Sequence, residues 1–467
     1  MSRSAWLPAD TRALVLITLL AGLLRLIGLS APGEIVFDES YYAQDACWYL
    51  YQSEALCTHR GEATPHHPPL AKWLIAAGIS LFGYTPFGWR IAAWTIGTLS
   101  IALLYLLARR LLLSTAGASI AAGLLAVDFL HFVHSRLAML DIFVTTFGLA
   151  AFLFAVYDRD SASRGLWRPW RIAAGLAAGA AIASKWSGLS VLAGVIALTV
   201  WWDARRSGGR AQGRTVIASL PSILLSLVVV PAIVYAASHI GRIQGQVFSP
   251  PWDTGSWVYE FLRRQWRTVK FHTRTFPPHP YQSPPWSWLL LRRPVVYFWE
   301  ESGPYLREIL ATGSPLVWWS SILAIGAAAV RWTRSRGDAE TVIVIGFAVT
   351  YLPWILFDRV RTFMFLFYLL PATPFLCLAV ARVAVAALAR PWGKVASAGF
   401  IAGTLALLLF YYPVLTARPL SYEAWAARVG PFRVCGPLGT PGGGRLEGTR
   451  HLPARLPGPP PKGWCWI

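Results

Sequence analysis

Residues 215–237 read TVIASLPSILLSLVVVPAIVYAA and contain no charged side chain. As an α-helix, these 23 residues would extend about 34 Å, enough to cross the roughly 30 Å hydrocarbon core of a bilayer. Similar apolar stretches recur along the 467-residue chain, of which 55% is hydrophobic and only 14% is charged. Soluble domains carry about 25% charged residues. The composition therefore excludes a soluble enzyme, a disordered chain and a fibrous protein, and it predicts an all-α polytopic membrane protein.

The apolar stretches predict about eleven transmembrane helices. The first is read as a retained helix, because no small-residue signal-peptide cleavage site follows it. Residues 172–202 form either two crossings or one long tilted helix. The expected spans are residues 12–30, 88–108, 115–133, 137–157, 172–184, 187–202, 215–237, 315–331, 341–357, 362–381 and 395–414.

The basic residues set the orientation of these spans, because short cytoplasmic loops are rich in Arg and Lys. With the N-terminus inside, every inner loop is basic, and two crossings within residues 172–202 preserve that pattern. The formal net charge of +20 reflects this topology, and no nucleic-acid-binding motif accompanies it. The inner basic residues are Arg109, Arg110, Arg159, Arg164, Arg168, Arg171, Arg205, Arg206, Arg210, Arg214, Arg331, Arg334, Arg336, Arg382, Arg390 and Lys394.

Two long loops, residues 31–87 and 238–313, then lie outside. The first contains a short amphipathic stretch, residues 70–82, which predicts a helix lying at the membrane interface. Residues 1–417 form one membrane domain, and residues 418–467 form an external Gly/Pro-rich tail without a helical period, in which residues 436–463 have the composition of a flexible linker. We find no internal repeat, which disfavours a transporter built from two related halves.

Two adjacent acids follow the first span, in the segment Phe37-Asp38-Glu39-Ser40-Tyr41-Tyr42. One interpretation is a solvated loop that begins a helix. The other makes one acid a general base at the membrane surface, close to a lipid-borne substrate. Neighbouring side chains on a helix diverge by about 100°, so the two acids are not expected to share one role.

Cations at the outer ends of other spans suit an anionic ligand. Arg136 has the planar donor fork that binds a lipid phosphate, and an ion pair between Arg136 and Asp141 is the alternative. Lys185 is either a second phosphate ligand or a snorkelling anchor. Arg361 lies in an outer turn, against the positive-inside preference, which favours an anionic ligand there.

Neither a metal site nor a disulfide scaffold is evident. The adjacent histidines at residues 66 and 67 are poor ligands for one ion, and no His or Cys partner has suitable spacing. Cys377 lies in an apolar span and is interpreted as a packing residue. The other four cysteines fall in two external pairs, Cys47 with Cys57 and Cys435 with Cys465, which are either disulfides or free thiols.

Together, the ordered motifs resemble the protein O-mannosyltransferase family, glycosyltransferase family 39 of the GT-C membrane class. The resemblance covers residues 12–420 and is closest to the bacterial, actinobacterial-like branch, which lacks the large luminal domain of fungal members. The matching stretches are Phe37-Asp38-Glu39, His67-Pro68-Pro69-Leu70-Ala71-Lys72, Ser135-Arg136-Leu137-Ala138-Met139-Leu140-Asp141, Ser184-Lys185-Trp186-Ser187-Gly188, His279-Pro280-Tyr281-Gln282-Ser283-Pro284, and Arg361-Thr362-Phe363 followed by Tyr368-Leu369-Leu370-Pro371.

The resemblance implies inverting transfer of mannose from a polyprenyl-phosphate-mannose donor to Ser/Thr hydroxyls of polypeptides that emerge from the secretion channel. It assigns the base to Asp38 and a donor-phosphate role to Arg136, and we expect Lys185 and Arg361 to assist at the phosphate. No cofactor is expected to be required, and the sequence leaves a divalent-cation requirement open. The protein is expected in the bacterial plasma membrane with its N-terminus in the cytoplasm and its active site outside. We expect acceptor-positioning roles for Glu39, Tyr41 and Tyr42, and supporting roles for His67, Lys72, Asp141, His279 and Ser283.

Two other functions remain open at this point. The first is another GT-C enzyme, such as an aminoarabinose transferase acting on lipid A, because the His67-Pro68-Pro69 motif occurs in both groups. The second is a polyprenyl-lipid transporter, which would have no need of adjacent acids at one outer mouth.

Overall fold

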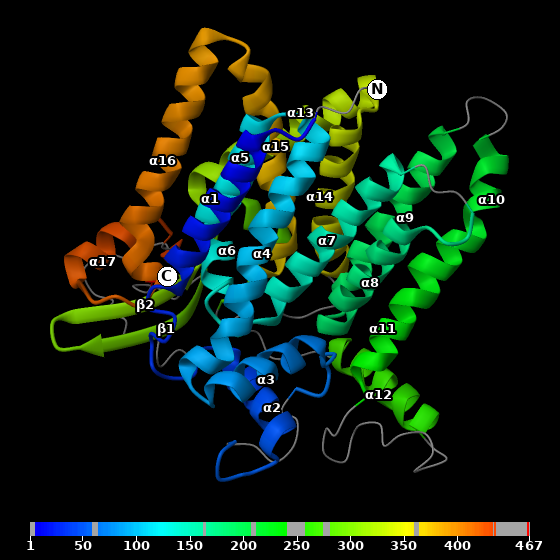
Figure 1. Ribbon diagram of the computed structural model, residues 1–467. Helices are drawn as coiled ribbons and strands as arrows, with labels where there is room; N and C mark the ends of the chain where they lie inside the picture. Colours follow the sequence, from blue (N-terminus) through cyan, green and yellow to red (C-terminus); the bar gives the residue numbers. More distant parts are fainter. Residues whose placement is uncertain are drawn as a thin grey trace.

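A bundle of membrane-spanning helices dominates the computed structural model (Figure 1). The structure describes residues 5–57, 64–161, 165–206, 212–240, 257–273, 281–358, 364–432, 434–435 and 465–466. Within these residues, eight helical segments are long and apolar enough to cross a membrane. They are α4 (Pro86–Leu112), α7 (Leu140–Asp160), α9 (Gly188–Arg205), the continuous run Thr215–Ser238 through α10 (Gln212–Leu224), the π-helix η2 (Leu225–Val229) and α11 (Val230–Ser238), α13 (Pro315–Ser335), α14 (Asp338–Phe357), the run Leu366–Leu388 through η4 (Leu366–Ala372) and α15 (Thr373–Leu388), and α16 (Pro391–Leu415).

Shorter or more polar helices occupy the positions of the other expected spans. They are α1 (Pro8–Leu26), the pair α5 (Thr115–Val127) and α6 (Phe129–His134), and α8 (Pro169–Ser184). The two-helix interpretation of residues 172–202 is confirmed, since a turn at Lys185–Ser187 separates α8 from α9. Asp128 separates α5 from α6, because its carboxylate accepts a hydrogen bond from the His131 backbone N–H at 3.0 Å and thereby begins a new helix.

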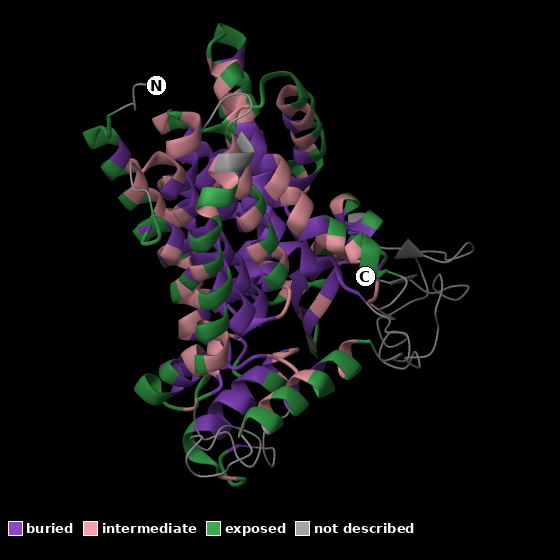
Figure 2. Cartoon of the chain, turned by 90° about the vertical axis from the view of Figure 1, so that its right-hand side faces the viewer, coloured by how far each residue is buried: buried purple, intermediate pink, exposed green. Residues whose placement is uncertain are grey.

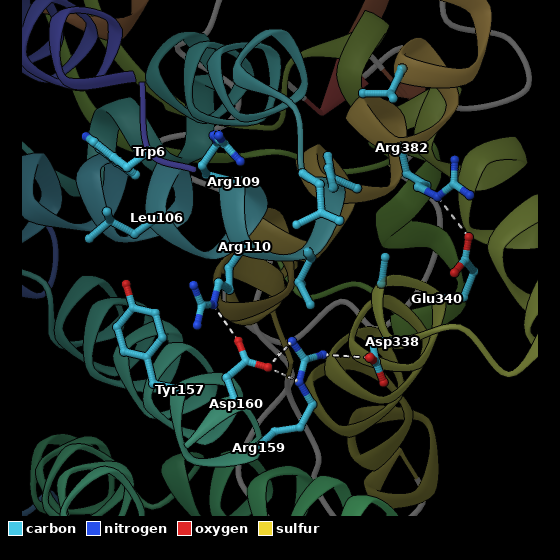
Figure 3. A pocket seen from close by; sticks show the side chains of 15 residues that line it. Trp6, Leu106, Arg109, Arg110, Tyr157, Arg159, Asp160, Asp338, Glu340 and Arg382 are labelled. Carbon is cyan, nitrogen blue, oxygen red and sulfur yellow. Dashed lines mark hydrogen bonds and ion pairs between the residues drawn. The ribbon is translucent and has the colours of Figure 1, made fainter. Parts of the chain in front are cut away.

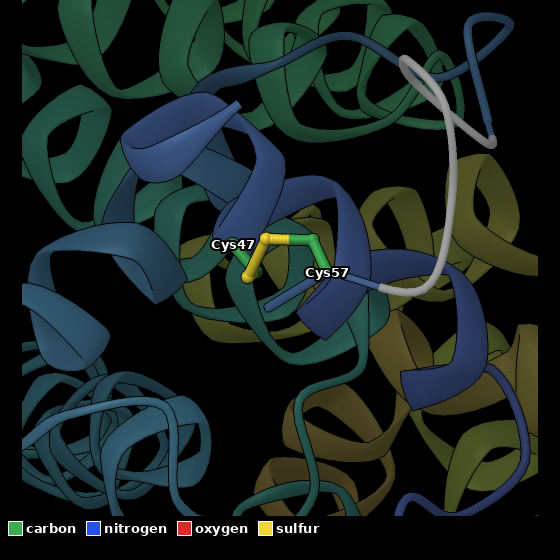
Figure 4. The surroundings of a disulfide bond; sticks show 2 residues. All are labelled: Cys47 and Cys57. Atoms are coloured by element: carbon green, nitrogen blue, oxygen red, sulfur yellow. A yellow bond between two sulfur atoms is a disulfide. The ribbon is translucent and has the colours of Figure 1, made fainter. Parts of the chain in front are cut away.

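The first external loop folds into two helices at one end of the bundle (Figure 1). These are α2 (Glu39–Tyr51) and α3 (Leu70–Phe82), and α3 has the bounds expected for the interfacial helix. The disulfide Cys47–Cys57 connects α2 to the chain that follows it, with a Cα–Cα distance of 5.8 Å (Figure 4). Lys72 on α3 forms a buried ion pair at 3.0 Å with Asp45 on α2. The disulfide and the ion pair therefore fix the loop directly after the candidate base.

The second external loop and the tail depart from the all-α expectation. The hairpin β1 (Val295–Ser302) and β2 (Tyr305–Ala311) pairs with the short strand β3 (Leu420–Ser421) in the order β1-β2-β3. The loop also contains α12 (Trp257–His272) and the 3-10 helix η3 (Pro285–Leu290), and the tail contains α17 (Tyr422–Val429) and η5 (Gly430–Phe432). The expectation of a tail without helical structure was therefore wrong for its first part, because residues 420–432 pack on the hairpin through Trp425, whose indole N–H donates to Glu308.

The second cysteine pair also lies on strands. In the antiparallel ladder of β4 (Val434–Cys435) and β5 (Cys465–Trp466), Cys435 is opposite Cys465. Both alternatives for this pair, a disulfide and free thiols, stay open, and the expected linker at residues 436–463 lies outside the described residues.

Buried residues concentrate along the axis of the bundle, and exposed residues cover its outer helices (Figure 2). At the end of α7 far from α2, a cavity of about 620 Å³ is surrounded by paired charges (Figure 3). Arg159 bonds to Asp160 and Asp338, each at 2.9 Å, and Arg382 bonds to Glu340 at 2.8 Å. The acids here neutralise arginines of the expected inner loops, so this end of the bundle is held together by ion pairs.

Candidate active site

Asp38 and Glu39 have different environments although they are adjacent. Glu39 is fully buried, and its carboxylate accepts two hydrogen bonds from Arg90, both at 2.8 Å. It also accepts from the backbone N–H groups of Val36 and Ala138, each at 3.0 Å. These contacts give Glu39 a structural role inside the protein, and its expected part in positioning the acceptor stays a prediction. Glu39 holds the chain before Asp38 against the segment that leads into α7.

Within the described part of the chain, the carboxylate of Asp38 is not engaged in an ion pair or a helix cap like those that fix other buried acids of the protein. Asp38 precedes the first residue of α2, yet its side chain makes no capping hydrogen bond to the helix. One oxygen instead accepts a hydrogen bond of 3.3 Å from the Tyr42 hydroxyl. The pKa of Asp38 is raised to about 6, mainly by burial and also by the negative charge of Asp141, while the charge of Lys185 and the Tyr42 hydrogen bond oppose the rise. A carboxylate with this pKa is ionised at neutral pH and can take up a proton, as a general base requires.

Lys185 provides the positive charge next to Asp38. Its ammonium donates to both carboxylate oxygens of Asp141 at 2.9 Å, and it lies 4.9 Å from the centre of the Tyr368 ring. The turn that carries Lys185 needs a glycine, because a Cβ on Gly188 would lie 2.5 Å from the Ala181 carbonyl carbon. The two helices α8 and α9 thus present a buried cation to the site from a very tight turn.

Aromatic side chains form the wall beside the base. Phe37 has a φ of 48°, which is uncommon for an aromatic residue, and its ring stacks on Tyr297 of β1 with 4.3 Å between centroids. His134 at the end of α6 bonds to the Tyr297 hydroxyl at 2.9 Å. Phe367 of η4 lies within 6 Å of both the Phe37 and the His134 ring. Elements that are far apart in sequence therefore converge on the residue preceding Asp38.

A cavity of about 350 Å³ opens beside this cluster. Lys185 and His67 line one part of it, and Leu189, Trp354 and Phe357 provide apolar surface from α9 and α14. Leu189 and Phe357 are exposed on membrane-spanning helices, so the apolar part of the cavity faces the lipid. The cavity thus has both apolar walls and a buried cation, the combination that a lipid phosphate requires.

Arg136 does not match the expected phosphate ligand. Its guanidinium is 4% exposed and donates to the carbonyl oxygens of Arg25, Ile27 and Gly28, at 2.7 Å for Ile27 and 2.8 Å for Gly28. It therefore satisfies the free carbonyls at the C-terminal end of α1. The alternative ion pair with Asp141 is also wrong, because Asp141 pairs with Lys185.

Of the remaining predicted residues, one contacts Asp38 and others make structural contacts away from it. Tyr42 contacts Asp38, whereas Tyr41 is 45% exposed. Lys72 is buried in its ion pair with Asp45, and Ser283 is buried and accepts from the Trp288 indole N–H at 3.0 Å. Both are structural contacts in the described chain.

Two expectations fall on residues that the structure does not describe. Arg361 and His279 both lie outside the described ranges. Among the residues that are described, no group of three or more His, Cys, Asp or Glu side chains could hold a metal ion. The expectation that no cofactor is needed stays a prediction.

Comparison with known proteins identifies the family. Residues 85–240 match the family model described as dolichyl-phosphate-mannose-protein mannosyltransferase, and residues 257–428 match that of the C-terminal four-transmembrane region of protein O-mannosyltransferase. A polyprenol-phosphate-mannose–protein mannosyltransferase of Corynebacterium glutamicum is 30% identical over 484 residues, with 89% of this chain and 91% of the relative covered. The chain belongs to the protein O-mannosyltransferase family. The resemblance seen in the motifs is confirmed, and family membership makes the chain a glycosyltransferase.

A second relative supports the family assignment, and solved structures support the fold. The protein of the same name from Mycobacterium tuberculosis is 29% identical, with coverage of 88% of this chain and 89% of the relative. A chain of the S. cerevisiae protein O-mannosyltransferase Pmt1-Pmt2 complex superposes with a TM-score of 0.73 at 15% identity, covering 91% of this chain and 93% of that one. ArnT from Cupriavidus metallidurans gives a TM-score of 0.53 at 16% identity, covering 90% and 72%. These likenesses establish the GT-C fold of a multi-pass membrane protein.

Proposed function

We propose that this family member transfers mannose from a polyprenyl-phosphate-mannose donor to Ser/Thr hydroxyls of polypeptides, with inversion and with Asp38 as the base. The observation that carries the proposal is the environment of Asp38. Its carboxylate is not used for helix capping, its pKa is raised to about 6, and it lies in the field of the Lys185–Asp141 pair, of which Lys185 lines the lipid-facing cavity. Family membership supplies the class of donor and acceptor.

In the proposed reaction, Asp38 accepts the proton of the acceptor hydroxyl while that oxygen forms a bond to C1 of mannose. The bond between C1 and the phosphate oxygen breaks on the opposite face of the sugar, and polyprenyl phosphate departs with the electron pair. Phosphate needs no protonation to leave, so one base suffices. Tyr42 keeps its proton, because burial holds its pKa well above the usual value, and its hydroxyl orients the Asp38 carboxylate.

Lys185 is proposed to stabilise the negative charge that develops on the departing phosphate. An ammonium has three N–H donors, and the contacts with Asp141 use two of them. Asp141 thus holds the Lys185 ammonium in place, and the third N–H of the ammonium is left for the phosphate. Arg361 remains a proposed second cation at the phosphate, on the sequence argument alone.

The proposed topology puts the N-terminus in the cytoplasm and the site on the outer face of a bacterial plasma membrane. Arg110, Arg159 and Arg382 lie at the end of the bundle away from α2 and α3, consistent with basic inner loops. The disulfide Cys47–Cys57 is in the first external loop, which also carries Asp38, and disulfides persist in oxidising compartments. A polypeptide acceptor would then reach Asp38 from outside.

Transfer by the reconstituted protein tests the function. The protein is supplied with labelled polyprenyl-phosphate-mannose and a Thr-containing peptide, with the same peptide carrying Val at each Thr position as the control. We expect α-linked mannose on the Thr peptide only, from a β-linked donor. Labelling of lipid A in place of the peptide would favour an aminoarabinose-transferase-like enzyme, and translocation of the donor without any transfer would favour a transporter. Either result would refute the proposal.

A further inference from the structure

Helix α12 has three distinct faces. Val258, Tyr259, Leu262, Trp266 and Val269 follow one another at helical spacing and are between 37% and 63% exposed. Such a row forms one continuous apolar stripe along the helix. A stripe of five exposed apolar side chains, two of them Tyr and Trp, is typical of a helix lying at a membrane interface.

The second face of α12 is basic. Arg267 and Lys270 are both exposed and lie on the flank of the apolar stripe. The Lys270 ammonium is 5.4 Å from the centre of the Trp266 ring, so its stem follows the edge of the stripe. Long basic side chains beside an apolar face reach from the acyl region to the lipid phosphates. This charge selects an anionic lipid surface over a neutral protein partner.

The third face attaches α12 to the protein. The Tyr235 hydroxyl of α11 donates to Gln265 at 2.6 Å, which fixes the middle of the helix. Phe271 stacks on His66 with 4.1 Å between centroids, and the His272 ring lies 5.9 Å from Trp186. The helix is thus held beside the turn that carries Lys185, at the same end of the bundle as α2 and α3 (Figure 1).

Helix α12 also borders the lipid-facing cavity. Val269, His272 and Thr273 line that cavity together with Lys185. Val269 belongs both to the apolar stripe and to the cavity wall, so a lipid that reaches Lys185 from the membrane passes the C-terminal end of α12. The exposed apolar faces of α9 and α14 continue the same surface through Leu189 and Phe357.

We propose that α12 lies in the outer-leaflet interface, with its apolar stripe in the acyl region and Arg267 and Lys270 bound to the phosphates of anionic lipids, and that it forms the membrane-side wall past which the lipid donor reaches Lys185. The donor part of the proposal rests on the proposed function. The docking of α12 on anionic lipid does not, so the two are tested by separate readouts.

The docking is tested without any transfer reaction. An environment-sensitive fluorophore is attached to the cysteine of the Leu262→Cys variant, and the protein is placed in nanodiscs of either phosphatidylglycerol or phosphatidylcholine. The matched control is Tyr305→Cys, at the exposed start of β2. The unsubstituted protein gives the background from its own cysteines. We expect blue-shifted emission at position 262 that brominated lipid quenches, more strongly with phosphatidylglycerol, and no such quenching at position 305. A second site on the stripe, Val258→Cys, should behave like position 262.

Water-like emission at positions 258 and 262 would overturn the proposal. So would a blue shift that brominated lipid does not quench, because a second copy of the chain or another protein would then cover the stripe. The charge contribution is tested with Arg267→Gln/Lys270→Gln, which should abolish the difference between the two lipids. The charge-matched variant Arg12→Gln/Arg334→Gln, at exposed positions on the opposite end of the bundle, should keep that difference.

The donor part is tested by kinetics in phosphatidylglycerol vesicles. Arg267→Gln/Lys270→Gln should raise the apparent KM for the polyprenyl donor about 25-fold and leave kcat unchanged, because each of the two cations near an anionic surface contributes about a fivefold attraction. The variant Arg12→Gln/Arg334→Gln should leave KM unchanged. A fall in kcat at constant KM would contradict a role in donor access while leaving the docking result intact.

Discussion

Replacing Glu39 by Gln should destabilise the protein strongly, although the change is nearly isosteric. Both side chains of the Glu39–Arg90 pair have no exposed surface, and the carboxylate accepts four hydrogen bonds at 2.8 to 3.0 Å. The amide has one acceptor oxygen and no charge, so the Arg90 cation loses its buried partner. Removing one partner of a buried pair costs about 3–5 kcal/mol, which is a large part of a typical stability of about 5–15 kcal/mol.

The loss can be measured by thermal or denaturant unfolding in detergent micelles. The control is Glu301→Gln, an exposed acid on β1, which should change the stability by less than about 0.5 kcal/mol. Arg90→Met should be similarly destabilising, and the double variant should be less destabilised than the sum of the two single variants, because the partners contact each other. If Glu39→Gln unfolds like the wild type, the buried pair does not hold the segment around Asp38 and the structural role assigned to Glu39 is wrong.

Three further outcomes are expected. First, kcat/KM for transfer should fall below pH 6 and reach about one tenth of its plateau near pH 5, because the pKa of Asp38 is raised to about 6 and the base must be ionised. A flat pH profile between pH 5 and 7 would argue against Asp38 as the base. Second, Lys185→Met should shift the fall in kcat/KM to higher pH, since the lysine charge lowers the pKa of Asp38. If the pH of this fall does not change, the charges of Lys185 and Asp38 are not coupled. Third, Arg136→Ala should lower the melting temperature and leave the donor KM of the folded protein unchanged, because its bonds are to the end of α1; a raised KM at unchanged stability would restore the phosphate-ligand role.

The sequence predicted the membrane architecture well, because hydropathy over about 20 residues depends only on local composition. The boundary between α8 and α9 and the bounds of α3 agree with the structure, and the structure decides in favour of a disulfide for Cys47 and Cys57, a pair that the sequence left open. The hairpin β1–β2 was not predicted, since its strands lie in a long loop that also carries helices. It provides Tyr297, which packs on Phe37.

The candidate site was predicted in part. The pair Asp38-Glu39 was singled out because two adjacent acids at a membrane surface are unusual, and the family resemblance then assigned the base to Asp38. The partner of Glu39 was missed, since Arg90 is 51 residues away, at the start of a span, and no local pattern connects the two residues. The role of Arg136 was mistaken for a similar reason: its partners are backbone carbonyls, which leave no mark in the sequence. His134 lies directly before the Ser135-Arg136 motif, and that position was the only signal that could have found it.

The most direct measurement on the proposed mechanism is the transfer rate of Asp38→Asn in reconstituted vesicles. The amide keeps the size of the side chain and can still accept the Tyr42 hydrogen bond, but it cannot take up the hydroxyl proton. We expect the melting temperature to stay within a few degrees of the wild type, and transfer to the Thr peptide to fall on the order of 10²- to 10⁴-fold, the usual contribution of a general base. Transfer at more than about half of the wild-type rate, at equal amounts of folded protein, would contradict the assignment of Asp38 as the base.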